Sequence, residues 1–188
     1  MGVIPTAKFL VGQHELSAEP RVSSSTSIQV RMVTPGAEIL GPLTVFCSYA
    51  HRDERLCCEL EKQLVPLQRG GQIAIWHDRR ITPGADLANE IDCKLATSHI
   101  ILLLVSPDFL VSDYCYRQEM HYAIARHHAG DARVIPIILR PCDWQATPLG
   151  RLLALPKDGK PVTSWVSRDE ALFDVARGVR RVVEELLA

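Results

Sequence analysis

The chain has 188 residues, of which 47% are hydrophobic and 23% charged, and its formal net charge at pH 7 is −1. This length is sufficient for one domain with a core of ordinary size, and two full domains are not expected. Acidic and basic residues are interspersed, and no basic stripe occurs on a predicted helix, which argues against nucleic acid as a partner.

The six cysteines and the longest apolar segment indicate the cellular setting. The cysteines show neither C-x-x-C pairs nor metal-ligand spacing, and several lie in apolar segments where cysteine acts as a small hydrophobe. The longest apolar run, Ile100 to Val105, is far too short to span a bilayer. We therefore expect reduced thiols in a cytoplasmic protein, with no membrane partner. No metal site is expected either, because the histidines lack suitably spaced ligand partners.

Residues 1–40 differ in composition from the rest of the chain. They contain the stretch "EPRVSSSTS", scattered prolines and glycines, and only short apolar patches. Such a composition buries too little apolar surface to offset the entropy cost of ordering the chain. We predict a flexible or weakly structured N-terminal arm over residues 1–40 and a folded domain over residues 41–188.

Four apolar segments predict the strands of a buried sheet. His99–Val105 is hydrophobic on both faces, as central parallel strands are. Pro136 cannot donate to a strand ladder, which predicts that the neighbour on that side of the last segment is short or absent. We assign this neighbour to a brief fifth strand around Pro161 to Trp165. The four segments are Leu43–Tyr49, Gln72–Trp76, His99–Val105 and Arg133–Leu139.

Helical patterns separate and follow these strands. A second helix follows the Pro83-Gly84 break, and a third is capped by Ser112 or Asp113 and runs to about His128. A fourth opens with the capping box Ser167-x-x-Glu170. The first helix places four leucines on one face, namely Leu56, Leu60, Leu64 and Leu67. The alternation predicts an α/β fold with a doubly wound parallel sheet.

Ligands of an open parallel sheet bind outside the carboxyl ends of its strands. Neither G-x-G-x-x-G nor G-x-x-x-x-G-K-[ST] occurs, so no glycine-rich phosphate cradle is predicted. A site with one carboxylate, hydroxyls and aromatic faces suits a neutral or cationic ring that bears sugars. The residues leaving the strand ends are Ser48, Tyr49, Trp76, His77, Asp78 and Ser106.

Five segments resemble, in order and spacing, the successive boxes of the Toll/interleukin receptor (TIR) domain, particularly its bacterial branch. They are "VFCSYAHRDE", "IWHDRRITPGADLANEI", "IILLLVSPDFLVSDYCYRQE", "VIPIIL" and "CDW". The resemblance covers about Leu43 to Leu187. It implies a flavodoxin-like, five-stranded parallel sheet and a family divided between NAD-cleaving enzymes and non-catalytic signalling adaptors.

The resemblance also implies a role for Glu119. In the enzymatic branch the glutamate of a W-x-x-x-E box on the third helix is catalytic, and Glu119 takes that position. Cys115 stands in the tryptophan position, so the aromatic contact falls to Tyr114 or Trp76. The plain alternative is that a glutamate in the first turns of a helix complements the helix dipole and is hydrated.

A single carboxylate suits the implied reaction. Cleavage of the bond between ribose and nicotinamide expels a ring that is already cationic in NAD⁺, so the general acid of ordinary glycosidases is dispensable. An ionised Glu119 would stabilise oxocarbenium character at the ribose. NAD⁺ is then the substrate, no cofactor is expected, and the products are nicotinamide and ADP-ribose or a cyclic ADP-ribose.

The other candidate residues have equally plain structural alternatives. Ser48 contacts the substrate or caps the first helix, and Trp76 stacks on a base or fills the sheet edge. The candidate substrate contacts are Ser48, Tyr49, Arg52, Trp76, Asp78, Ser106, Ser112, Tyr114 and Cys115.

The segment "HDRRITPGAD" resembles the BB loop, which packs against neighbouring TIR domains in assemblies of the family. This resemblance implies other TIR domains as partners and self-association as the activating step. The plain alternative is a surface loop, and the two interpretations are compatible. The candidate self-association residues are Arg79, Arg80, Ile81, Pro83 and Gly84.

Overall fold

The computed structural model describes residues 41–77, 86–112 and 119–188, all of which belong to one unit of the chain. The predicted N-terminal arm, residues 1–40, lies outside the described residues. So do residues 78–85, which include the segment that resembles the BB loop, and residues 113–118.

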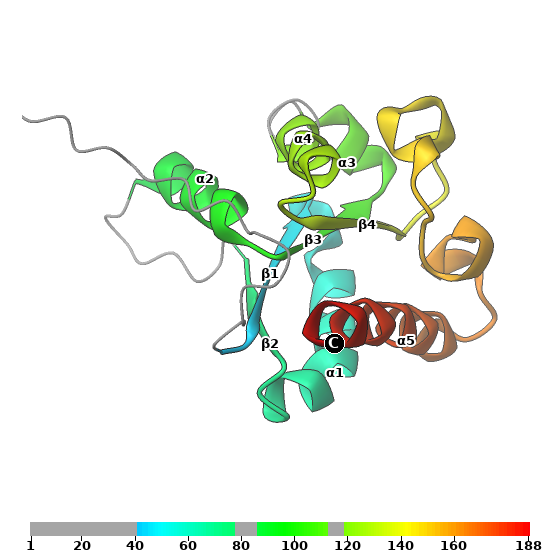
Figure 1. Cartoon of the computed structure of the whole chain (residues 1–188). Helices are drawn as coiled ribbons and strands as arrows, with labels where there is room; N and C mark the ends of the chain where they lie inside the picture. Colours follow the sequence, from blue (N-terminus) through cyan, green and yellow to red (C-terminus); the bar gives the residue numbers. More distant parts are fainter. Residues whose placement is uncertain (1–40, 78–85, 113–118) are drawn as a thin grey trace, which may run out of the picture. The chain divides into compact units, whose positions relative to one another are not determined.

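The described strands form a parallel sheet in the order β2-β1-β3-β4 (Figure 1). Ser48 of β1 lies opposite Leu103 of β3, and Val105 of β3 lies opposite Ile138 of β4. The chain leaves β1 toward β2 on one side and reaches β3 on the other, so the strand order reverses beside β1. The flavodoxin-like, doubly wound α/β fold is thereby confirmed. The strands are β1 (Leu43–Tyr49), β2 (Ile73–Trp76), β3 (Ile100–Val105) and β4 (Arg133–Ile138).

The expected fifth strand does not form. Residues Val162–Ser164 make a short 3₁₀-helix instead, and β4 pairs on its outer side with the single residue Leu155. Leu155 N–H donates to Pro136 O at 2.8 Å, and Ile138 N–H donates to Leu155 O at 2.8 Å. Pro136 thus directs its backbone toward this outer edge, where a proline has no N–H to give. A ladder longer than one bridge would lack that hydrogen bond.

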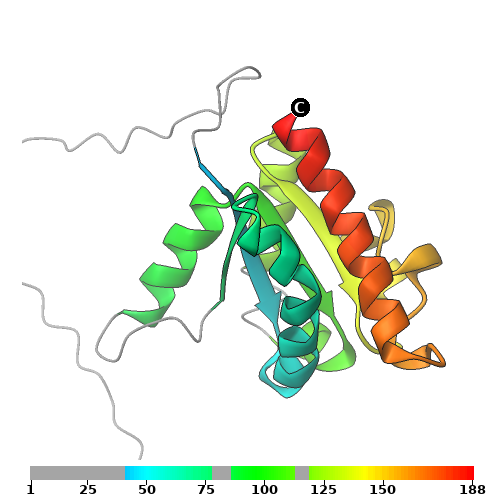
Figure 2. The same ribbon diagram turned by 90° about the horizontal axis from the view of Figure 1, so that it is seen from below.

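Helices cover both faces of the sheet (Figures 1 and 2). Helices α1 (Glu54–Arg69) and α5 (Arg168–Leu187) pack on one face, where the four leucines of α1 are buried as predicted. The opposite face carries α2 (Leu87–Thr97), α3 (Pro107–Val111) and α4 (His121–Ala129). No helix among the described residues is long and apolar enough to cross a membrane.

Two helices begin after a serine N-cap. Ser167 caps α5 as predicted, because its Oγ accepts from Glu170 N–H at 3.3 Å. The short helix α3 was not predicted. It begins at Pro107 after Ser106, whose Oγ accepts from Phe109 N–H at 3.1 Å. Serine at the N-cap followed by proline at the first helical position is a known start signal.

Side-chain alternation along β1 determines which face carries the candidate site. Val45, Cys47 and Tyr49 belong to the core beneath α1 and α5, whereas Phe46 belongs to the core on the other face. Because successive strand residues point to opposite faces, Ser48 lies on the Phe46 face. Met120, directly before α4, is fully buried in that same core. The start of α4 therefore lies over the face that carries Ser48.

Candidate functional site

Ser48 and Glu119 form a direct pair. Both are buried, at 2% and 5% relative exposure, and Ser48 Oγ donates a hydrogen bond to Glu119 Oε2. Ser48 makes no helix cap, since Asp53 is the N-cap residue of α1 and Ala50 precedes the 3₁₀ turn His51–Asp53. Of the two alternatives for Ser48, the helix cap is therefore wrong. A substrate contact stays a prediction.

Glu119 is the first described residue of the helical segment that continues into α4, and Met120 after it has right-handed helical dihedral angles. Glu119 and Met120 have π-helical conformation immediately before α4. Short π-helical turns are rare and occur frequently at functional sites. A buried carboxylate near the strand end, bonded by a side-chain hydroxyl, is also unlike the hydrated helix charge considered as the plain alternative.

Trp76 extends this row of residues toward the sheet edge. It is half-buried and stacks on Phe46, its register partner, with ring centroids 5.4 Å apart and an interplanar angle of 17°. Phe46 in turn precedes Ser48 by two residues and points to the same face. Tyr49 points to the opposite face and lies in the core under α1 and α5.

A second polar cluster joins the ends of three adjacent strands. Arg140, which follows β4, donates from Nε to Asp53 Oδ1 at 2.7 Å and from Nη2 to Asp53 Oδ2 at 3.2 Å. Ser106, which follows β3, donates to Asp53 Oδ2 at 2.5 Å. Asp53 and Ser106 are 2% and 0% exposed. The hydroxyl of Ser106 is thus engaged inside the protein, and its predicted substrate contact remains untested.

Asp108 links this cluster to the surface. It accepts from Arg140 Nη2, and Arg52 Nη1 lies 3.4 Å from its Oδ1. The hydrogen bond from Arg140 holds the pKa of Asp108 below its ordinary value. The hydrogen bond to Asp53, and to a smaller extent the one to Asp108, raises the pKa of Arg140 above its ordinary value. The predicted contact Arg52 is largely exposed, so it lies at the rim of this cluster.

The remaining predicted residues divide into two groups. Ser112 is the C-cap residue of α3, and its N–H donates to Asp108 O at 3.1 Å. The other predicted contacts lie outside the described residues, and their roles stay predictions. They are Asp78, Tyr114 and Cys115, together with the self-association candidates Arg79, Arg80, Ile81, Pro83 and Gly84.

The cluster of Asp53, Asp108 and Arg140 was not predicted from the sequence. One signal was available, since Arg140 comes two residues after the end of β4 and strand ends were already the expected place for a site. His77, another strand-end residue, is buried and contacts α1 through Nε2, which lies 3.2 Å from Glu61 Oε1.

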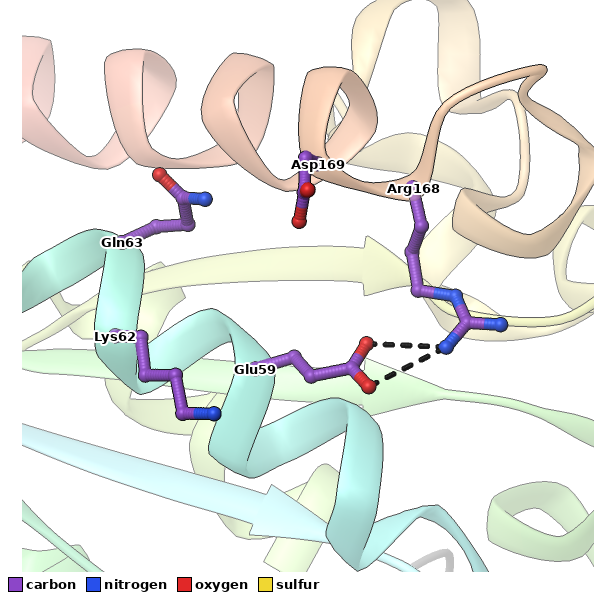
Figure 3. A pocket seen from close by; sticks show the side chains of 5 residues that line it. All are labelled: Glu59, Lys62, Gln63, Arg168 and Asp169. Carbon is purple, nitrogen blue, oxygen red and sulfur yellow. Dashed lines mark hydrogen bonds and ion pairs between the residues drawn. The ribbon is translucent and has the colours of Figure 1, made fainter.

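A separate hollow of about 400 Å³ lies between α1 and α5, on the face of the sheet opposite Ser48 (Figure 3). Arg168 Nη1 lies 3.3 and 3.1 Å from the two carboxylate oxygens of Glu59, and Arg55 Nε donates to Glu59 Oε1 at 3.0 Å. Burial acts to raise the pKa of Glu59, but these arginines outweigh it and hold that pKa below its ordinary value. The pairs join two helices, and exposed pairs of this kind contribute little stability. The lining residues are Glu59, Lys62, Gln63, Arg168 and Asp169.

In the part of the chain that the structure describes, no three His, Cys, Asp or Glu side chains come together in a way that could hold a metal ion. The candidate site consists of the Ser48–Glu119 pair, the Trp76–Phe46 stack and the cluster around Arg140.

Residues 45–169 match the protein family described as "TIR domain". This match spans more than half of the chain, and the chain belongs to the TIR domain family. The family resemblance expected from the sequence boxes is confirmed.

Similar proteins include a curated relative and a solved structure. A curated relative, "Uncharacterized protein y4lF" from Sinorhizobium fredii, is 57% identical over 137 residues, which are 73% of this chain and 42% of the relative. The chain thus spans less than half the length of that relative. A crystal structure of the TIR domain of the Toll-related Receptor TRR-2 from Hydra magnipapillata has a TM-score of 0.53 and 24% identity, covering 74% of this chain and 97% of that one. This likeness shows the TIR fold.

Proposed function

We propose that this TIR domain is an NAD⁺ glycohydrolase that cleaves the bond between nicotinamide and ribose, with Glu119 as its catalytic carboxylate. The observation that carries the proposal is the buried hydrogen bond from Ser48 to Glu119, beside the point where the strand order of the sheet reverses. In this fold class, ligands bind at that point.

The proposed reaction consumes one water molecule. The C1′–N1 bond breaks with both electrons passing to nicotinamide, which leaves neutral. The oxygen of water then bonds to C1′ to give ADP-ribose, and its proton is released to solvent. In a cyclic product, an adenine nitrogen takes the place of water. Glu119 lies beside the developing positive charge of the ribose and stabilises it electrostatically.

Ser48 supports this role by fixing the direction of the carboxylate. A group that is already oriented needs little reorganisation when charge develops, which is the main source of electrostatic catalysis. The Trp76–Phe46 stack lies in the same row of the sheet and offers an aromatic face for a base or the nicotinamide ring. These residues act on NAD⁺ as substrate, and the proposal needs no bound cofactor.

The second candidate function is a non-catalytic adaptor that acts through contacts between TIR domains. One observation favours it: Glu119 is only 5% exposed and hydrogen-bonded, which also describes a carboxylate that merely secures α4 to β1. An enzyme loses its activity when the charge of Glu119 is removed, whereas an adaptor has no NAD⁺ cleavage to lose.

The substitution Glu119→Gln separates these functions. Its amide oxygen still accepts from Ser48, so we expect the melting temperature to change little. NAD⁺ cleavage should fall by at least about a hundredfold, because an electrostatic stabiliser of the transition state has been removed. Nicotinamide release is measured by chromatography. The control Glu185→Gln removes an exposed carboxylate on α5 and should cleave like the parent. Cleavage by Glu119→Gln within a few fold of the parent would reject the catalytic assignment.

We further propose that self-association through the segment that resembles the BB loop activates the enzyme. Specific activity should then rise over about a hundredfold range of protein concentration, because association is governed by mass action. Arg80→Glu should weaken this rise, while the matched charge reversal Arg151→Glu, at an exposed arginine of a 3₁₀-helix, should leave it intact. Constant specific activity from a protein that stays monomeric by light scattering would reject self-association as the activating step.

A further inference from the structure

The side chain of Arg140 lies where the carboxyl ends of three strands meet. Its Nε and Nη2 bond both oxygens of Asp53, at 2.7 and 3.2 Å, and Nη2 also lies 3.2 Å from Ser106 Oγ. Asp108 accepts from the same Nη2. Asp53 follows β1, Ser106 and Asp108 follow β3, and Arg140 itself follows β4. One guanidinium thus joins the carboxyl ends of three neighbouring strands.

The geometry of this junction depends on arginine. The planar guanidinium presents donors in a fixed fork, which can hold a carboxylate through two bonds at once. The side chain of Asp53 is 1% exposed, so water does not replace these bonds. A lysine at the same place would keep the charge but would offer a single ammonium without a fixed direction.

Two of the joined segments lead to the candidate site. Asp53 lies five residues after Ser48, and its N–H closes a tight turn onto Ala50 O at 2.7 Å. Ser106 caps α3, which ends at Val111 on the way to Glu119. Arg140 therefore holds together the two segments that follow these strands. One comes directly after β1, the strand that carries Ser48, and the other comes after β3 and leads toward Glu119.

We propose that Arg140 is a positioning residue for the reaction at Glu119, an inference that rests on the proposed function. It acts through Asp53 and Ser106, holding the exits of β1 and β3 in the register that lets Ser48 meet the Glu119 carboxylate. Arg140 itself need not touch the substrate.

A matched pair of substitutions tests this role. Arg126, at the opposite end of the sheet, also binds through several bonds, donating to the backbone oxygens of Leu95, Ser98 and Asp131. Arg140→Lys should lower kcat for NAD⁺ cleavage about tenfold or more, with a smaller change in KM, because misplaced catalytic groups lose rate steeply. Arg126→Lys should leave kcat near the parent value. Equal kcat in all three proteins, or equal losses in both variants, would overturn the positioning role.

A double-substitution cycle identifies the route of the effect. If Arg140 acts through the Ser48–Glu119 hydrogen bond, then Arg140→Lys should cost little kcat once Ser48→Ala has removed that bond. Residues that work through one shared contact show such non-additive losses. Losses that add fully would mean that Arg140 supports the fold without positioning Ser48, and the proposal would be rejected.

Hydrogen exchange separates failure of this inference from failure of the proposed function, because it needs no substrate. Arg140→Lys should speed exchange in residues 48–56 and 106–112 and leave α5 unchanged, while Arg126→Lys should not affect those two segments. A parent protein that does not cleave NAD⁺ would reject the proposed function, and the exchange result would then decide whether Arg140 positions these segments. Uniform or unchanged exchange would overturn the inference.

If Arg140→Lys does not fold, the double variant Asp53→Asn with Arg140→Gln takes its place in these experiments. This double variant leaves no lone buried charge, because both partners of the ion pair are neutral.

Discussion

The two ends of the sheet use polar side chains in different ways. At the amino ends, most of these bonds go to the backbone: His99 Nδ1 accepts from Thr44 N–H at 3.1 Å and also lies 2.7 Å from Thr44 Oγ1, and Arg126 donates to three carbonyl oxygens. At the carboxyl ends, side chains bond to one another, as in the pairs Ser48–Glu119 and Asp53–Arg140.

The side chains that bond to the backbone help to maintain the fold, whereas the side chains that bond to one another hold functional groups in place. A side chain that bonds a backbone group satisfies an atom that the fold would otherwise leave unpaired. A side chain that bonds another side chain fixes the direction of a functional group, which is what a binding or catalytic site needs. We therefore assign mainly structural roles to the side chains at the amino ends of the strands, and the candidate site to the carboxyl ends.

Removal of Arg140 should cause the largest loss of stability. Arg140→Ala leaves the Asp53 carboxylate, 1% exposed, without its cation, and breaking a buried ion pair in this way costs about 3–5 kcal/mol. Urea denaturation measures the loss. The control Arg133→Ala breaks an exposed pair with Glu185, whose atoms are 3.6 Å apart, and should cost less than about 1 kcal/mol. A similar small loss for Arg140→Ala would show that Asp53 is not held by this pair.

The elements of the fold were largely predictable from local pattern. The strand Leu43–Tyr49 has the bounds that its apolar run predicted, and the four leucines of α1 are buried along one helical face. These signals lie within a few residues of one another. The failed fifth strand also had a local warning, because Pro136 limits pairing on the outer edge of β4.

The cluster around Arg140 was not predictable in the same way. Its bonds join Asp53 to Arg140 over 87 positions and Asp53 to Ser106 over 53 positions. No periodicity connects residues at such separations, so their contact depends on the register of the sheet. Glu119 was found only through the family resemblance, since its helical position alone also fits a hydrated surface charge.

Removal of Arg126 should have a smaller effect than removal of Arg140 and should sharpen the contrast between the two ends. Arg126→Ala deprives three carbonyl oxygens of a donor, at 2.7, 2.8 and 3.0 Å. We expect a loss of about 2 kcal/mol, because these groups are only partly buried and water can reach them. If the proposed function holds, NAD⁺ cleavage by the folded fraction should match the parent. A fall in kcat without loss of stability would contradict the structural assignment of the amino ends.

The smallest expected effect is a pH dependence located at the amino ends. Burial, and then the charge of Arg126, lower the pKa of His99 below its ordinary value. The acceptor role of Nδ1 toward Thr44 N–H likewise requires that Nδ1 carry no proton. The folded state therefore binds fewer protons at His99 than the unfolded chain. Its stabilising contribution is present above the unfolded pKa of about 6.5 and is lost as the pH falls through the lower folded-state value.

The carboxyl ends should respond in a different pH range. Because its folded-state pKa is lowered, Asp108 contributes stability above its unfolded pKa of about 3.9 and loses that contribution only in stronger acid. Urea midpoints at about pH 7.5 and about pH 5.5, on either side of the ordinary histidine pKa, thus report on histidines and not on Asp108.

The variant His99→Asn tests this assignment, because its side-chain oxygen can accept from Thr44 N–H without titrating. Its stability should fall less than that of the parent between the two pH values. Some dependence should remain, since burial also lowers the pKa of His127, whose Nδ1 accepts from Val134 N–H at 3.4 Å. Equal losses in His99→Asn and the parent would show that the contact between Thr44 and His99 does not control the acid response.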